Sequence, residues 1–128
     1  MATRSARSNG FTLVELMVVL AIIALLISIV APHYVGRVAR AEEAVLRENL
    51  TLMREALDRH YADAGRYPTS LEELVNKRYL RAIPEDPITH SSSSWVVIPP
   101  DDPKKGMVYD VKSGAKGAGS NGKPYAQW

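Results

Sequence analysis

Three residues near the start of the chain have types and spacing that could support chemistry. Gly10 is followed directly by Phe11, and Glu15 lies four residues further on, inside an apolar stretch. Cleavage between Gly10 and Phe11 would create an α-amino group at the i, i+4 spacing from Glu15, which is one helical turn. That amine could pair with its own glutamate or with the glutamate of a neighbouring subunit. A cut at this position would therefore give Glu15 a cationic partner.

The apolar run over residues 11–31 is long enough to cross a membrane. Among its 21 residues the polar or charged ones are Thr12, Glu15 and Ser28. A helix of this length spans about 30 Å, the thickness of a bilayer's hydrocarbon core. A secretory signal has a shorter apolar segment, usually about 7–15 residues, and ends in a small-x-small cleavage site. We therefore predict a single-pass anchor with a cytoplasmic N-terminus, because Arg4 and Arg7 precede the run.

Glu15 is costly in such an anchor. A carboxylate at mid-membrane costs roughly 2.5–3.5 kcal/mol on insertion scales, and an intramembrane charge usually marks a function with a partner. The alternative is that Glu15 lies near the cytoplasmic face and extends towards water. In that case it sets no contact between subunits.

The stretch Gly10-Phe11-Thr12-Leu13-Val14-Glu15, after a short basic leader and before Pro32, resembles the type IV pilins and type II secretion pseudopilins. The resemblance implies that a prepilin peptidase removes the leader, residues 1–10, and methylates the new amine of Phe11. It implies that Glu15 guides assembly of identical subunits into a helical filament. It further implies contacts with minor pseudopilins and with an inner-membrane assembly platform and its ATPase.

Beyond the apolar run the sequence predicts an amphipathic helix over residues 32–64. Pro32 should kink the helix where the two parts meet, because proline lacks an N–H group. The apolar positions keep a spacing of three or four over much of this segment: Val35, Val38, Leu46, Leu50, Met53, Leu57 and Tyr61. Gly65 is placed to end the helix. Packing on a sheet is favoured over a coiled-coil dimer, because the repeat is short.

The rest of the chain predicts a short helix and a small sheet. Ser70 and Glu73 form a capping-box pattern that opens a helix over residues 70–79. Apolar and aromatic runs predict strands at 95–98, 107–111 and 125–128. The predicted fold is α+β and pilin-like, a long N-terminal helix packed on a small antiparallel sheet within 95–128. Residues 32–128 would form the periplasmic domain, and residues 66–87 are similar to the region after the long helix in the major pseudopilin of type II secretion.

Several functional classes are disfavoured by the sequence. The 16 basic residues exceed the 14 acidic ones by two, and removal of Arg4 and Arg7 brings the formal charge to zero, which disfavours nucleic-acid binding. The glycines between Gly117 and Gly122 imitate a nucleotide loop, but only six residues follow them. No HExxH or GxSxG motif is present, so we predict that the protein is not an enzyme. His33, His60 and His90 are predicted to be solvated or at interfaces.

Carboxylates in the second half could attract calcium. They are Asp86, Asp101, Asp102 and Asp110. The resemblance implies a calcium site in an acidic C-terminal loop, yet no carboxylate side chain follows Asp110. We predict weak or absent calcium dependence and no other cofactor, with Asp110 as a weak candidate ligand.

Two functions agree with these features. The first is a structural subunit of a type II secretion pseudopilus that extends from the inner membrane into the periplasm. The second is a major or minor type IV pilin for adhesion, motility or DNA uptake. The small size of the domain and the lack of cysteine favour the first.

Overall fold

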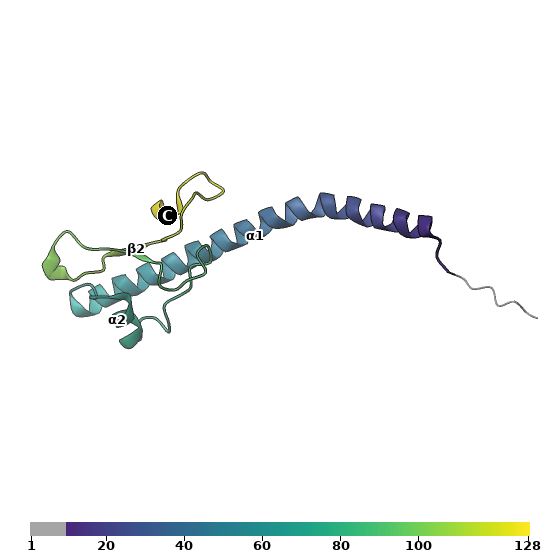
Figure 1. Ribbon diagram of the computed structural model, residues 1–128. Helices are drawn as coiled ribbons and strands as arrows, with labels where there is room; N and C mark the ends of the chain where they lie inside the picture. Colours follow the sequence, from purple (N-terminus) through teal and green to yellow (C-terminus); the bar gives the residue numbers. More distant parts are fainter. Residues whose placement is uncertain (1–9) are drawn as a thin grey trace, which may run out of the picture. The chain divides into compact units, whose positions relative to one another are not determined.

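A computed structural model describes residues 10–128. The predicted leader lies outside the described residues apart from Gly10. The chain divides into two compact units, with the boundary between Arg37 and Val38. Helix α1, Leu13–Ala64, contributes to both units and is drawn as an unbroken ribbon in Figure 1.

The helix α1 continues through Pro32, which lies inside its 52 residues. Its end agrees with the prediction from the sequence. Gly65 follows Ala64 with a φ of 72°, and its N–H donates to the carbonyl of Tyr61 at 2.8 Å. A residue in this left-handed conformation ends a helix at least cost when it is glycine.

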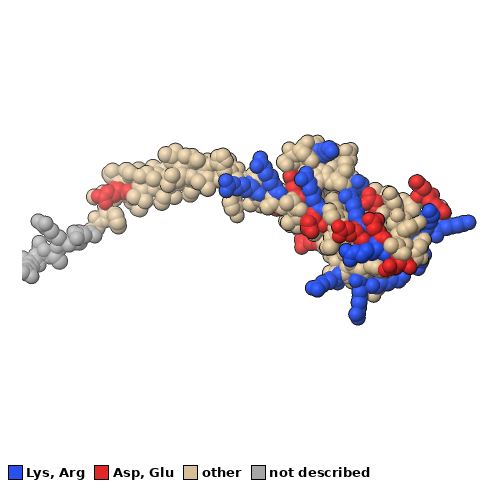
Figure 2. Space-filling view, turned by 180° about the vertical axis from the view of Figure 1, so that it is seen from behind, with Lys and Arg blue, Asp and Glu red and all other residues tan. Residues whose placement is uncertain are grey.

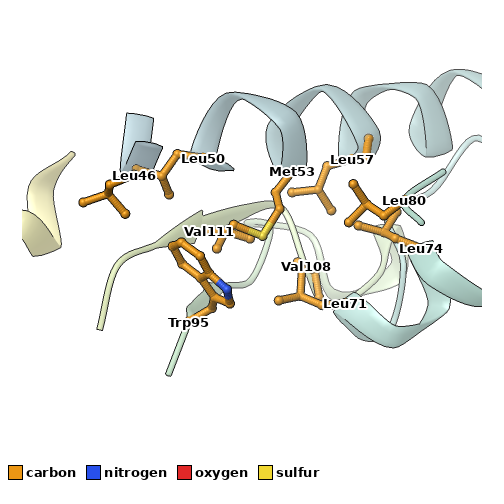
Figure 3. Packing of buried hydrophobic residues seen from close by; sticks show 11 residues of the cluster. Leu46, Leu50, Met53, Leu57, Leu71, Leu74, Leu80, Trp95, Val108 and Val111 are labelled. Atoms are coloured by element: carbon orange, nitrogen blue, oxygen red, sulfur yellow. The ribbon is translucent and has the colours of Figure 1, made fainter. Parts of the chain in front are cut away.

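One face of α1 forms the core of the second unit. Leu46, Leu50, Met53 and Leu57 are buried there, which confirms the middle of the predicted apolar stripe. They pack against side chains from elsewhere in the unit, as Figure 3 shows: Leu71, Leu74, Leu80, Trp95, Val108 and Val111. The start of the stripe is different, because Val35 is exposed and Val38 is partly so.

The second helix, α2, covers Leu71–Asn76 and is shorter than predicted. Ser70 caps it as expected, accepting the N–H of Glu73 at 3.4 Å, while the Glu73 carboxylate accepts the N–H of Thr69 at 2.6 Å. The helix ends early because Arg78 has a φ of 64°. Glycine after a helix indicates from the sequence where the helix ends, whereas an arginine in the left-handed conformation gives no such indication.

The sheet has two described strands, β1 (Val96–Ile98) and β2 (Asp110–Lys112), which pair antiparallel with Val97 opposite Val111. A 3₁₀ helix, η1, covers Pro103–Lys105 between them. The second strand starts later than predicted, because Met107 and Val108 both donate their N–H groups to the carbonyl of Pro68. That binding directs this stretch to the loop before α2 instead of to β1.

The predicted strand at 125–128 is wrong. Tyr125–Gln127 form a 3₁₀ helix, η2, which follows Pro124. Proline cannot donate to a strand ladder, and the main chain before it makes only an isolated bridge between Ala118 and Pro124. The described sheet therefore keeps two strands, and the fold is α+β with a long N-terminal helix, as predicted.

Candidate functional site

The amino end of α1 carries the residues that the sequence predicts for processing and assembly. Glu15 lies in the first turn of the helix. Its N–H donates to the side-chain oxygen of Thr12 at 3.2 Å, so Thr12 caps the helix. Sequence reasoning did not single out Thr12, although a Thr followed three residues later by Glu is a capping signal.

The described chain is the uncut form, in which α1 begins at Leu13. Phe11 and Thr12 precede the helix. The cut after Gly10 and the pairing of the Phe11 amine with Glu15 therefore stay predictions.

The large apolar side chains of the first unit are exposed. The large apolar residues from Phe11 to Val30 have exposed fractions between 46% and 87%. Between Glu15 and Arg37 the sequence has no Lys, Arg, Asp or Glu, and the face of this stretch in Figure 2 is tan. Among the described residues, α1 is the one helix long and apolar enough to cross a membrane. An exposed apolar surface of this extent marks a membrane or protein interaction site.

A second cluster lies in the other unit, where the tail (residues 113–128) meets α1. Glu43 is only 6% exposed, and its carboxylate accepts both the N–H and the hydroxyl of Ser120, at 2.7 and 2.6 Å. The hydroxyl of Tyr125 donates to the same carboxylate at 3.3 Å. These donors stabilise the ionised carboxylate and hold the pKa of Glu43 below its ordinary value, against the opposing effect of burial.

Arg54 forms the second contact between α1 and the tail. Its Nε donates to Oδ1 of Asp110 at 2.9 Å, and its Nη2 donates to the main-chain oxygens of Val111 and Trp128, at 3.1 and 2.7 Å. The guanidinium of Arg47 lies 4.5 Å from the centre of the Trp128 ring. Hydrogen bonds from the charged guanidinium of Arg54 therefore fix strand β2 and the tail to one face of α1.

Two of the four candidate calcium ligands already bind side-chain donors of the chain itself. Oδ1 of Asp110 is bound by Arg54 and by the N–H of Val111. Asp86 is fully buried and accepts from the hydroxyl of Ser113 and the N–H of Ile88. Donors of the chain thus occupy oxygens of Asp86 and Asp110, whereas Asp101 and Asp102 are exposed. Within residues 10–128 no three His, Asp or Glu side chains are grouped so that they could hold a metal.

The prediction that His60 is solvated or at an interface is wrong. Its side chain is fully buried on α1, with Nδ1 2.8 Å from the carbonyl of Arg66. Because a carbonyl only accepts, Nδ1 carries the proton there. Nε2 has no hydrogen-bond partner in the described structure and lies 3.6 Å from the carboxylate of Glu73.

The sequence contained a signal for both buried polar residues that we missed. Glu43 and His60 continue the helical spacing of the buried stripe, one before Leu46 and the other after Leu57. A polar residue at a core position needs a partner inside the protein.

Comparison with known proteins places this sequence in a family. A model described as the prokaryotic N-terminal methylation motif matches residues 5–31, a range that includes Gly10, Phe11 and Glu15. The type II secretion system core protein G of Aeromonas hydrophila is 36% identical over 100 residues, which cover 76% of this chain and 68% of that protein.

The chain belongs to the type II secretion system core protein G family. The core protein G of Klebsiella pneumoniae is 34% identical over 97 residues, covering 63% of this chain and 69% of that relative. The core protein G of Escherichia coli K12 is 29% identical over 112 residues, covering 88% of this chain and 77% of the relative. No solved structure gave a significant match.

Proposed function

We propose that this member of the core protein G family is a structural subunit of the type II secretion pseudopilus and not an enzyme. A prepilin peptidase cuts after Gly10 and methylates Phe11. The mature subunit is held in the inner membrane by residues 11–31, with its amino end in the cytoplasm. Subunits then assemble through these helices into a periplasmic filament that drives the export of folded proteins.

The observation that carries this proposal is the exposed apolar half of α1. It combines a methylation motif at its start, a carboxylate in its first turn and side chains that no described part of the chain covers. A soluble protein would lose solubility with such a surface. A filament subunit that is first stored in a membrane needs such an apolar surface twice. The surface faces lipid before assembly and the helices of other subunits afterwards.

Processing is tested first by intact mass spectrometry of the protein extracted from membranes. We expect a chain that begins at Phe11 and carries one added methyl group. Gly10→Val should block the cut, and Gly36→Val is the matched control, because a Cβ at either glycine meets no other atom within 4 Å. Recovery of an uncut wild-type chain would contradict the proposal.

Filament function is tested in cells that lack the gene and are complemented with each variant. We expect sheared filaments and secreted protein with the wild type and with Gly36→Val, and neither with Gly10→Val. Filaments that appear on the outer cell surface and support adhesion, without loss of secretion on deletion, would favour a type IV pilin instead.

A further inference from the structure

An open groove lies on α1 where the apolar run ends. Its volume is about 400 Å³, and it is lined by Ile29, Val30, His33, Tyr34 and Arg37. All five belong to one helix face within the first unit. One end of the groove is aliphatic, and the other end offers an imidazole, a phenol and a guanidinium.

The spacing along the helix sets the depth of these groups in a bilayer. If residues 11–31 fill the hydrocarbon core, His33 and Tyr34 lie roughly 3–5 Å beyond Ala31 and Arg37 lies about 9 Å beyond it. The headgroup layer adds roughly 5–8 Å on each side of the core. Helical side chains lean towards the amino end, so the Arg37 guanidinium extends back into this layer.

The groove is positively charged and has no counter-charge of its own. No Asp or Glu occurs between Glu15 and Glu42. Arg37 makes no ion pair with any described residue. Since an arginine fork matches the oxygens of a phosphate, the unpaired charge at this depth suits an anionic headgroup.

We propose that this groove binds the phosphate of an anionic phospholipid. Arg37 and His33 donate to the phosphate oxygens, Tyr34 lies at the interface as aromatic residues commonly do, and Ile29 and Val30 contact the first part of an acyl chain. The inference rests on the proposed insertion of residues 11–31 in a membrane. It adds a lipid contact that fixes the depth of the subunit and must break when the subunit leaves the bilayer for the filament.

The test uses the full chain in lipid nanodiscs made from phosphatidylcholine alone or from equal amounts of phosphatidylcholine and phosphatidylglycerol. Native mass spectrometry then counts the lipids that stay bound. We expect the wild type to retain phosphatidylglycerol preferentially and Arg37→Gln to reduce that preference about fivefold, the effect of one cationic side chain at an anionic surface. Arg81→Gln is the matched control, because Arg81 is exposed, lies outside the apolar run and pairs with no described carboxylate.

The outcomes separate this inference from the proposed function. Insertion in both kinds of disc without any headgroup preference would overturn the lipid site and leave the pseudopilin proposal intact. Equal losses from Arg37→Gln and Arg81→Gln would overturn it as well, and so would displacement of phosphatidylglycerol by inorganic phosphate. A chain that enters neither kind of disc would overturn both proposals.

Discussion

At the scale of single residues, Glu15 and Glu43 are two carboxylates on one helix with opposite surroundings. Glu15 lies in the exposed apolar half of α1, and no described side chain donates to its carboxylate. Glu43 is buried and accepts three hydrogen bonds from the tail. The first is therefore available to a partner outside the chain, and the second is already used within it.

Removing the Glu15 carboxylate should separate membrane insertion from assembly. We expect Glu15→Val to give normal membrane levels and a normal cut after Gly10, because the helix becomes more compatible with lipid. Few or no filaments should form, because the Phe11 amine of each subunit loses its partner. Glu15→Asp should be intermediate, since it keeps the charge and loses about one methylene of reach. Immunoblots of sheared filaments and membrane fractions measure both quantities.

Wild-type amounts of filament from Glu15→Val would contradict this prediction. Glu15 would then merely extend towards water at the membrane face.

Neutralising Glu43 should loosen the tail. We expect Glu43→Gln to lower the free energy of unfolding by about 1.5 kcal/mol, the lower end of the range for hydrogen bonds to charged groups. Because folding lowers the pKa of Glu43 from 4.5, its contribution is complete above pH 4.5 and is lost as the pH falls through the folded-state pKa. Denaturant unfolding of the full chain in detergent, followed by tryptophan fluorescence across pH, measures both effects.

Glu48→Gln is the control for this experiment, because Glu48 is exposed on the same helix. Equal stability losses from the two variants would mean that the Glu43 contacts with Ser120 and Tyr125 contribute nothing.

At the scale of elements, the start of α2 is held by one carboxylate. Glu73 accepts from the N–H and the hydroxyl of Thr69, and its Oε1 lies 3.0 Å from Nζ of Lys77. The hydrogen bond from the Thr69 N–H and the contact with Lys77 lower the pKa of Glu73 to about 2. The helix has only six residues, so this cap contributes much of its local order.

Glu73→Gln should therefore destabilise the domain by about 1 kcal/mol at neutral pH, as loss of a helix cap commonly does. Folding lowers this pKa, so the stabilisation is present above pH 4.5 and falls between about pH 4.5 and 2. That part of the acid sensitivity should be absent in the variant. Glu72→Gln is the control, since Glu72 is exposed and adjacent; an unchanged acid profile in Glu73→Gln would contradict the prediction.

The elements show what the sequence could and could not predict. The long helix, its end at Gly65 and the Ser70 cap follow local rules that involve residues within a few positions of each other. The tail follows contacts between residues far apart in the chain, such as Glu43 with Ser120. Together with Pro124, those contacts override the strand propensity of Tyr125 and Trp128, and the partners in such contacts cannot be read from neighbouring residues.

The candidate site divides in the same way. Gly10, Phe11 and Glu15 could be selected from the sequence because their chemistry depends on spacing along one segment. Arg54 could not, because its role depends on which strand and which tail residue the fold brings to it. The roles of Gly10, Phe11 and Glu15 therefore stay predictions from the sequence, whereas the contacts of Arg54 required the structure.

At the scale of the whole molecule, hydrogen bonds of Glu43 and Arg54 fix the tail to α1. Calcium should therefore shift the melting temperature of the full chain in detergent by less than about 2 °C relative to chelator, since an ion that finds no site on the folded state cannot stabilise it. Magnesium serves as the control for a general effect of divalent cations. A large upward shift with calcium alone would show that the tail rearranges to bind it.

The spacing of charges along α1 has an electrical consequence for a processed subunit. Between Glu15 and Arg37 the helix has no Asp, Glu, Lys or Arg, and cleavage after Gly10 would add one cationic amine beside the Glu15 carboxylate. The amino end would then carry no net charge, so drawing it outward through the bilayer would do almost no work against the membrane voltage. With Glu15 replaced by valine the same movement would transport one positive charge, at about 2.3 kcal/mol for each 100 mV. The glutamate would thus make extraction of the subunit independent of how strongly the cell membrane is energised.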